Sequence, residues 1–217
     1  MKNEELRTFL AVILFAVAVI TLSLWKDGGY AFLPALHDAF FNVSTIISTT
    51  GFGTADFTRW PELCKWILIL IMFCGGCAGS TGGGIKFSRV MILFKSAFSD
   101  LRRISRPRNV IRVSLDGQRV EDETIHATYT FAALYFILLI LFSALLSFDG
   151  TDIATCFTAA LSCLSNVGPG MTPVIGPAGS FAFFTVRSKL LLSLAMLIGR
   201  LEIYPILVLL MPRTWRR

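Results

Sequence analysis

The chain is poor in charged residues, in histidine and in paired metal ligands. Only 16 % of its 217 residues are charged, whereas a soluble domain carries closer to a quarter. The two histidines, His37 and His126, lie far apart with no acidic or nucleophilic motif around them. The five cysteines are odd in number, and the CxxC pair Cys74 and Cys77 has no second pair or histidine nearby. A disulfide framework, a zinc site and histidine chemistry are therefore not indicated, and small thiols packed between helices are favoured.

Hydrophobic residues are abundant instead. They make up 54 % of the chain, and the mean hydropathy is +0.69. Four stretches approach the roughly 20 apolar residues that cross a bilayer as a helix: 8–24, 66–98 with an interruption, 127–148 and 190–211. No small-x-small cleavage pattern follows the first stretch, so we interpret it as a retained span rather than a secretory signal. We expect an all-α integral membrane protein with about four transmembrane spans.

The net charge of +6 is distributed unevenly. Lysines and arginines gather before the first stretch, between the second and third, and after the fourth. These segments share one side if four spans zigzag through the bilayer, and an excess of positive residues marks the cytoplasmic side. We therefore expect both termini in the cytoplasm, and we expect no nucleic-acid partner.

Two similar units make up the chain. Residues 1–100 form the first, 101–123 a basic linker, and 124–217 the second. Each unit has a long apolar segment, a short amphipathic segment (35–48 and 152–165), a glycine pattern and a further long apolar segment. The short segments cannot cross a bilayer, which predicts two re-entrant pore helices within two helix–pore-loop–helix repeats. The linker is either a solvated loop that fixes orientation or, less favoured, a docking surface for a soluble partner.

A five-residue pattern ends each short segment: Thr49-Thr50-Gly51-Phe52-Gly53 and Asn166-Val167-Gly168-Pro169-Gly170. Glycine permits an extended backbone with its carbonyls pointing one way. A ring of such carbonyls can replace the water around a potassium ion, and the negative C-terminal end of a short helix favours a cation. The candidate ion-binding residues are Thr49, Thr50, Gly51, Phe52, Asn166, Val167, Gly168 and Pro169.

A glycine-rich run, GGCAGSTGGGIK from Gly75 to Lys86, interrupts the second apolar stretch. Glycine disfavours helix by about 1 kcal/mol per residue, so we expect a loop here. The Walker A spacing fails, because Ile85 separates Gly84 from Lys86 and Phe87 stands where Ser or Thr is needed. With no acid, base or metal set beside it, an enzyme is not indicated. We expect either a gate loop or close helix packing by small residues; the gate residues would be Gly75, Gly76, Gly79, Ser80, Thr81, Gly82, Gly83 and Gly84.

Two charges lie within the last apolar stretch, in Gly199-Arg200-Leu201-Glu202-Ile203-Tyr204-Pro205. An intramembrane arginine costs roughly 2.5–3.5 kcal/mol, so it should face a polar cavity or a partner. On one continuous helix Arg200 and Glu202 would lie on different faces. We expect Arg200 to face the pore below the filter. Glu202 would pair elsewhere, with the opposed helix or the glycine-rich loop, or form a structural ion pair without a role in transport.

The motifs TTGFG, GGCAGSTGGGIK, SNVGPG and GRLEIYP, in this order, resemble those of the Trk/Ktr/HKT superfamily of potassium transporters. The chain is most similar to the C-terminal half of the membrane subunit of the bacterial Trk system, and the resemblance covers nearly its whole length. It implies four repeats around one pore, of which this chain would carry the third and fourth. It also implies a filter lined by the backbone of 49–51 and 166–168, an intramembrane gate from Gly75 to Gly84, and a pore-facing Arg200.

The resemblance further implies potassium uptake across the bacterial inner membrane, without a cofactor and with K⁺ as the transported ion. Expected neighbours are lipid and a cytoplasmic nucleotide-binding regulatory subunit. Two pore loops cannot surround an ion with four-fold carbonyls, so we expect this chain to need an N-terminal half or a second copy of itself. The alternative is a non-conducting regulatory or assembly subunit. Potassium over sodium selectivity, and a channel-like mechanism versus symport with protons or sodium, are left open by the sequence.

Overall fold

The computed structural model describes residues 3–105 and 113–205, and most of them are helical. The helices are α1 (Glu4–Lys26), α2 (Phe32–Ile47), α3 (Glu62–Phe73), α4 (Phe87–Ser105), α5 (Asp122–Leu146), α6 (Ile153–Ser165) and α7 (Val186–Arg200). Short 3₁₀ turns lie at Phe57–Arg59, Ser147–Asp149 and Phe181–Phe183. Two-residue strands, β1 (Ser114–Leu115) and β2 (Gln118–Arg119), pair antiparallel. The expectation of a helical chain is confirmed.

Two of the four expected spans are continuous helices. The segments Glu4–Lys26 and Asp122–Asp149 are long and apolar enough to cross a membrane by length and composition. Asn3 caps the first by accepting a hydrogen bond from the Leu6 amide at 3.0 Å. Large apolar side chains on both helices point outward, with Phe15 71 % and Ile140 66 % exposed. A helix that is apolar on all faces suits a lipid surrounding.

The other two expected spans are interrupted. The stretch 66–98 divides into α3 and α4 at the glycine-rich run, as its composition predicts. The prediction of one helix over 190–211 is wrong: α7 ends at Arg200, and a turn comes after it. Glu202 and Ile203 both have positive φ, +59° and +62°, which a helix does not tolerate. Residues 206–217, the rest of that stretch, lie outside the described residues.

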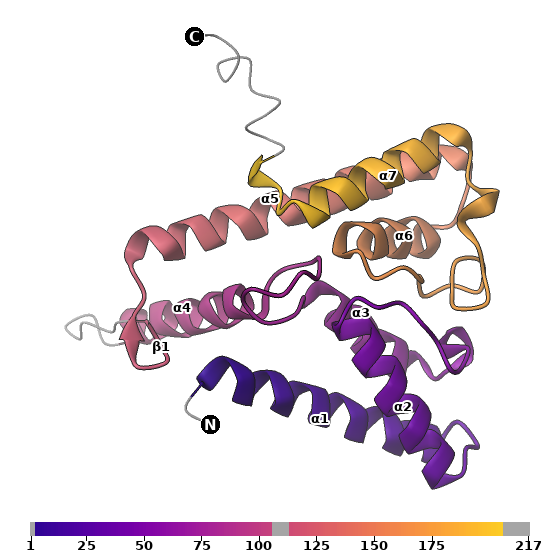
Figure 1. The fold of residues 1–217 in the computed structure, drawn as a ribbon, viewed down its shortest axis with the longest axis horizontal. Helices are drawn as coiled ribbons and strands as arrows, with labels where there is room; N and C mark the ends of the chain where they lie inside the picture. The colour runs from indigo at the N-terminus through magenta and orange to yellow at the C-terminus, as the bar shows by residue number, and fades with distance from the viewer. Residues whose placement is uncertain (1–2, 106–112, 206–217) are drawn as a thin grey trace.

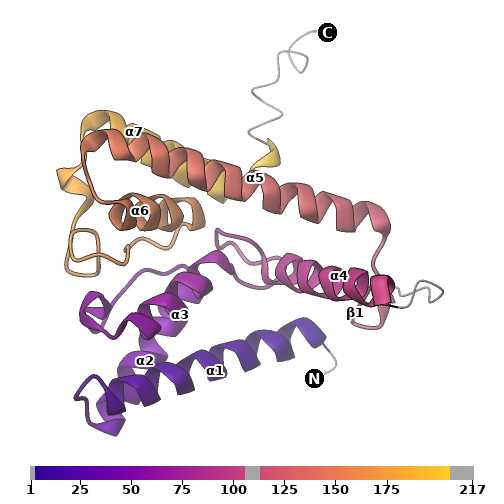
Figure 2. The same ribbon diagram turned by 180° about the vertical axis from the view of Figure 1, so that it is seen from behind.

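Each half places its short helix against its long one. Figure 1 shows α2 beside α1, and α6 between α5 with α7 and the rest of the molecule; Figure 2 shows the same pairs from behind. The N-terminus, the C-terminal end of α4 and the strands share one end of the molecule, and both short helices lie toward the other. The core runs through both halves, with side chains at most 1 % exposed at Ile20, Leu24, Val43, Leu68, Tyr135, Leu139, Leu161 and Leu164.

The short helices begin with different caps. Helix α2 starts at Phe32, slightly before the expected 35, with Pro34 in its first turn where no amide partner is needed. Its N-cap residue Ala31 makes no side-chain hydrogen bond. In α6 the Asp152 carboxylate accepts from the Thr155 amide at 3.0 Å. These hydrogen bonds with Thr155 hold the pKa of Asp152 below its ordinary value.

The linker contains a hairpin. Helix α4 continues to Ser105, and the hairpin turn lies at Asp116-Gly117, where φ is +52° and +79°. The sequence predicts this turn from the Asp-Gly pair. Residues 106–112, which include the arginines at 106 and 108, lie outside the described residues.

Candidate functional site

The two glycine patterns have the same backbone conformation. At the first position Thr49 has φ +57° and Asn166 has φ +56°; at the third, Gly51 has φ +83° and Gly168 has φ +114°. The residues between them, Thr50 and Val167, do not have positive φ. Left-handed φ is ordinary for glycine and tolerated by asparagine, but it is unusual for β-branched Thr49. We call residues 49–51 and 166–168 the paired segments.

Backbone hydrogen bonds repeat as well. The Thr50 amide donates to Thr45 O at 2.9 Å, and the Val167 amide donates to Ser162 O at 3.0 Å. Each bond closes the C-terminal end of a short helix. In a plain strand successive carbonyls point to opposite sides. Alternation of positive and negative φ turns every second peptide, so that successive carbonyls can face one side.

The paired segments lie against one another although α3, α4 and α5 separate them in sequence. A methyl group built on Gly51 would lie 2.3 Å from Val167 O, and one on Gly168 would lie 3.7 Å from Gly51 Cα. Only glycine fits at 51 for this reason as well as for its φ. Both segments line one cavity of about 440 Å³, together with Ser162, Cys163, Phe181, Lys189, Leu192, Ser193 and Met196.

The two ring residues of the pattern differ in position. Phe52 is 71 % exposed, whereas Pro169 is buried. Pro169 packs beside Gly51, since its Cδ would lie 3.3 Å from a methyl group at that position. The equivalence of the two patterns therefore extends over their first three residues and ends at the fourth.

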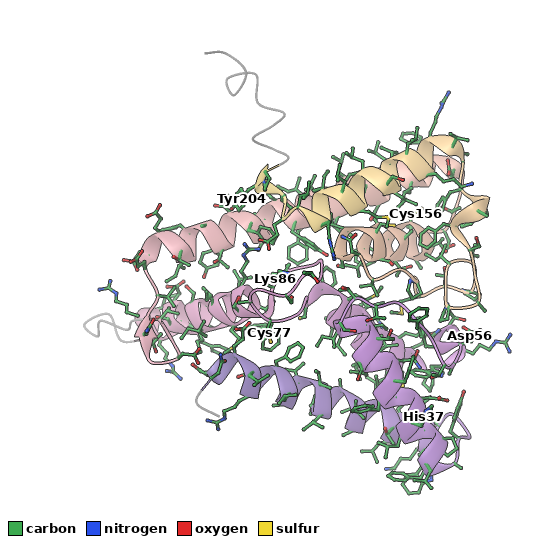
Figure 3. All side chains as sticks on the ribbon, in the orientation of Figure 1. His37, Asp56, Cys77, Lys86, Cys156 and Tyr204 are labelled. Atoms are coloured by element: carbon green, nitrogen blue, oxygen red, sulfur yellow. The ribbon has the colours of Figure 1, made fainter. Side chains whose placement is uncertain are left out.

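The glycine-rich run forms a loop with its two ends pinned together. The Gly75 amide donates to Ile85 O at 2.7 Å, the Ile85 amide to Phe73 O at 3.0 Å, and the Phe87 amide to Gly76 O at 3.2 Å. Cys74 and Ile85 form an isolated parallel bridge. The loop from Gly75 to Gly84 therefore projects from a closed neck between α3 and α4, which Figure 3 shows with Cys77 and Lys86 labelled.

This loop touches both paired segments. A methyl group on Gly83 would lie 2.3 Å from Ser165 O, next to Asn166, and one on Gly82 would lie 3.1 Å from Thr49 Oγ1. The glycines thus permit a close approach of backbone to backbone. Gly83 and Gly84 are buried, while Gly79, Ser80 and Thr81 at the far part of the loop are exposed.

Lys86 holds the loop, a role that the sequence did not reveal. The residue is 6 % exposed, and its Nζ donates to Ser80 O and to Gly82 O, both at 2.6 Å, and to Ser80 Oγ at 3.3 Å. Sequence reasoning used Lys86 only to test a phosphate loop. A lysine directly after a glycine run in an apolar stretch is itself a signal, because such a charge needs partners.

Glu202 pairs with Arg89 of α4, in agreement with the expectation that it finds a partner on an opposed element. The Arg89 Nη2 to Glu202 Oε2 distance is 2.8 Å. The Arg89 guanidinium also lies over the ring of Phe131, 4.2 Å from its centroid. Because α7 has ended, the expected separation of Arg200 and Glu202 on two helix faces does not apply. Sequence reasoning did not single out Arg89.

Arg200 is the last residue of α7 and is exposed. Within residues 3–105 and 113–205 its side chain makes no hydrogen bond or ion pair. The preceding Gly199 brings α7 close to the end of α6, since a methyl group there would lie 1.8 Å from Leu164 O. Asn166 Nδ2 donates to Met196 O at 3.1 Å, so α7 also holds one paired segment.

Comparisons with known proteins agree with this architecture. A family model described as "TrkH: Cation transport protein" matches residues 6–216. The Trk system potassium uptake protein TrkG of Escherichia coli (strain K12) is 34 % identical over 99 % of this chain and 44 % of its own length. The TrkH protein of Salmonella typhimurium (strain LT2) is 35 % identical over the same shares. The chain spans less than half the length of these curated relatives.

A solved structure is similar throughout. The crystal structure of the potassium transporter TrkH from Vibrio parahaemolyticus matches with a TM-score of 0.91 and 33 % identity, over 99 % of this chain and 46 % of that one. The sequence motifs, the helical architecture and the family model all point the same way. The chain belongs to the TrkH family of cation transport proteins.

Proposed function

We propose that the chain forms half of a potassium uptake pore in the bacterial inner membrane, as the C-terminal half of a Trk-type subunit. The names of the relatives support potassium as the transported ion. The single observation that supports an ion pathway best is the shared backbone of the paired segments, which lie in contact with alternating φ. In this proposal they are two of the four walls of a selectivity filter, with α2 and α6 as re-entrant pore helices.

The mechanism rests on carbonyl oxygens. A potassium ion entering the filter exchanges its water for backbone carbonyls of Thr49, Thr50 and Gly51 on one side, and of Asn166, Val167 and Gly168 on another. The C-terminal ends of α2 and α6 meet these segments and add a negative dipole end that favours a cation. No chemical step is required, which agrees with the transport proteins found as relatives.

The glycine-rich loop is the proposed gate. Its contacts with Ser165 and Thr49 support a position at the inner end of the filter, where it would obstruct the ion. The three hydrogen bonds from Lys86 Nζ keep it closed. Arg200 adds a positive charge near the same level that lowers cation occupancy, and the Arg89–Glu202 pair fixes the turn after α7.

Two walls cannot enclose an ion, so the proposed pore needs two more. An N-terminal half supplied by another chain, or a second copy of this chain, would provide them. We propose both termini on the cytoplasmic side, where Lys and Arg are in excess. A nucleotide-binding regulatory subunit would contact the same side. In this assembly the 101–123 linker separates two repeats, 1–100 and 124–217.

The test is growth of a bacterial strain without its own potassium uptake systems on limiting potassium. The chain is expressed alone and with the N-terminal half of a full-length relative, each as wild type and as Gly51→Ser. Rescue that the variant loses supports a pore, and rescue by the chain alone supports self-assembly. No rescue in either setting, with the protein inserted in the membrane, contradicts the proposal and favours a non-conducting subunit.

A further inference from the structure

An acid from outside the loop holds its far side. Glu5, in the first turn of α1, is only 8 % exposed, and its Oε1 accepts a hydrogen bond from the Ala78 amide at 2.7 Å. Ala78 lies in a turn that the Ser80 amide closes by donating to Cys77 O at 3.0 Å. A carboxylate is costly to bury unless it is hydrogen-bonded. The sequence separation of 73 residues makes this a tertiary contact.

Glu5 and Lys86 bind complementary groups of the same loop. Lys86 Nζ takes the carbonyls of Ser80 and Gly82, and Glu5 takes the amide of Ala78. Hydrogen bonds to a charged partner are roughly twice as strong as neutral ones. The loop has six glycines between Gly75 and Gly84 and little side-chain packing of its own. These two side chains therefore fix much of its conformation.

The neighbouring acid ties the same turn of α1 to the hairpin. Glu4 Oε1 accepts from Lys95 Nζ of α4 at 2.5 Å, and Glu4 Oε2 accepts from the Asp116 amide at 3.3 Å. The Glu4 amide donates to Asp116 Oδ1. Lys95 Nζ also donates to Ser114 O at 2.9 Å. Glu4 is thus the point at which α1, α4 and the hairpin meet.

Glu4 and Glu5 are consecutive residues of one helical turn, so a displacement of one moves the other. The ring of Phe9 packs edge-on against that of Phe87, with centroids 5.3 Å apart, which joins α1 to the first residue of α4. Figure 1 shows the start of α1 at the same end of the molecule as the hairpin. A continuous path of contacts therefore runs from the hairpin, through the first turn of α1, to the glycine-rich loop.

We infer that the acid pair Glu4–Glu5 couples the hairpin of residues 113–120 to the gate loop. Glu5 is the positioning residue that keeps the loop against the paired segments, and Glu4 transmits the position of the hairpin to it. The inference rests on the proposed function, since it names the regulation of the proposed gate. A ligand or partner that displaces the hairpin would release the loop through this turn.

Hydrogen–deuterium exchange of peptides covering 75–84, measured by mass spectrometry on the full chain in lipid nanodiscs, tests the inference without any transport. We expect Glu5→Ala to speed exchange in this loop about tenfold, the effect of losing one hydrogen bond to a charged group. Glu4→Gln, which leaves Glu5 in place, should give a smaller rise of about threefold through the loosened turn.

The matched control is Glu62→Ala, which removes another first-turn acid, paired with Lys65 at 2.6 Å and without contact to the loop. Its loop exchange should equal the wild type. Unchanged exchange in Glu5→Ala overturns the clamp, and unchanged exchange in Glu4→Gln overturns the link to the hairpin. If peptides from the middle of α1 exchange faster in Glu5→Ala to the same extent as the loop, Glu5 serves only helix packing, and the inference is likewise overturned.

Rubidium efflux from vesicles that contain the chain with an N-terminal half gives the functional arm. Glu5→Ala should raise the basal leak, and Glu4→Gln should raise it less. Absence of flux in the wild type would contradict the proposed function and leave the exchange result standing. Wild-type flux that Glu5→Ala leaves unchanged, despite faster loop exchange, would contradict the role of Glu5 in gating.

Discussion

The two halves of the chain share one backbone conformation at the paired segments and differ in the helices beyond them. Thr49 and Asn166 agree within about a degree of φ, and both short helices end in the same hydrogen bond. After α2 the chain reaches α3, which stops at Phe73 and gives way to the glycine-rich loop. After α6 it reaches α7, which runs unbroken to Arg200. Ion coordination requires equal walls, whereas a single loop suffices to obstruct a pathway.

The comparison also separates two uses of glycine. At 51 and 168 glycine supplies positive φ. At 83 it supplies space, because the Ser165 carbonyl lies where a side chain would be. The first use is symmetric between the halves, and the second belongs to a loop that only the first half carries. Substitutions can therefore affect the symmetric feature or the asymmetric one separately.

The largest effect is expected at Gly51. Gly51→Ala meets both positive φ and a carbonyl 2.3 Å from the new methyl group, so one paired segment must move. Gly168→Ala meets the φ alone, at a cost of about 1–2 kcal/mol or roughly tenfold. Potassium uptake by the chain with an N-terminal half should fall to background in the first variant and about tenfold in the second.

Gly29→Ala is the control for these two variants, because Gly29 has φ +67° and nothing within 4 Å of the added methyl group. It shares the backbone strain and lies outside the paired segments, so its uptake should equal the wild type. Equal losses at positions 51 and 168 would contradict the importance of the close contact between the two halves.

The next effect concerns the asymmetric loop. Lys86→Met keeps the volume of the side chain and removes the bonds to Ser80 and Gly82, each of which is worth about 1.5–3 kcal/mol for a charged donor. The loop should open more often, and rubidium leak from vesicles should rise at least about tenfold. Lys65→Met, which removes a lysine paired with Glu62 outside the loop, should leave the leak unchanged. A lower leak in Lys86→Met would show that the lysine opens the loop.

A smaller effect is expected at the ion pair that joins the halves. Arg89 and Glu202 are 26 % and 44 % exposed, so solvent weakens their attraction, and we expect a coupling of about 1 kcal/mol. A thermal-denaturation cycle of Arg89→Gln, Glu202→Gln and the double variant measures it. Arg89→Lys tests the stacking on Phe131, since lysine lacks the planar group. Additive effects in the cycle would assign no role to the pair.

Local patterns in the sequence were enough for the helical class, the break at the glycine run and the position of both patterns. They are short-range features: apolar length, glycine content and a repeated motif. The end of α7 was missed, because Leu201 to Tyr204 are compatible with helix by composition. The turn there depends on Arg89, which is 113 residues away in sequence.

The same reason explains the residues that sequence reasoning did not find. Lys86 and Glu5 matter because a loop folds back on them, and no local pattern indicates which backbone groups that loop presents. The contact between the paired segments is likewise tertiary. Repetition of the motif suggested equivalent roles, but only the fold brings Gly51 to Val167.

The smallest effect contrasts the two helix caps. Ala31 and Asp152 precede α2 and α6 with nearly the same backbone, φ −69° and ψ 152° against φ −65° and ψ 152°, yet only Asp152 bonds an amide. Asp152→Ala should lower the free energy of unfolding by about 1 kcal/mol, and Ala31→Ser should raise it by about as much. For a chain of this size each corresponds to a shift of about 2–4 °C in Tm.

The pH dependence distinguishes these two caps. The pKa of Asp152 is lowered in the folded protein, so its stabilisation is complete above the unfolded value of about 3.9 and is lost as the pH falls through the folded pKa. The Tm difference between wild type and Asp152→Ala should therefore shrink below about pH 4. The gain from Ala31→Ser should persist, because a hydroxyl does not titrate there. A gain that disappeared with acid in Ala31→Ser as well would mean that a different carboxylate controls both short helices.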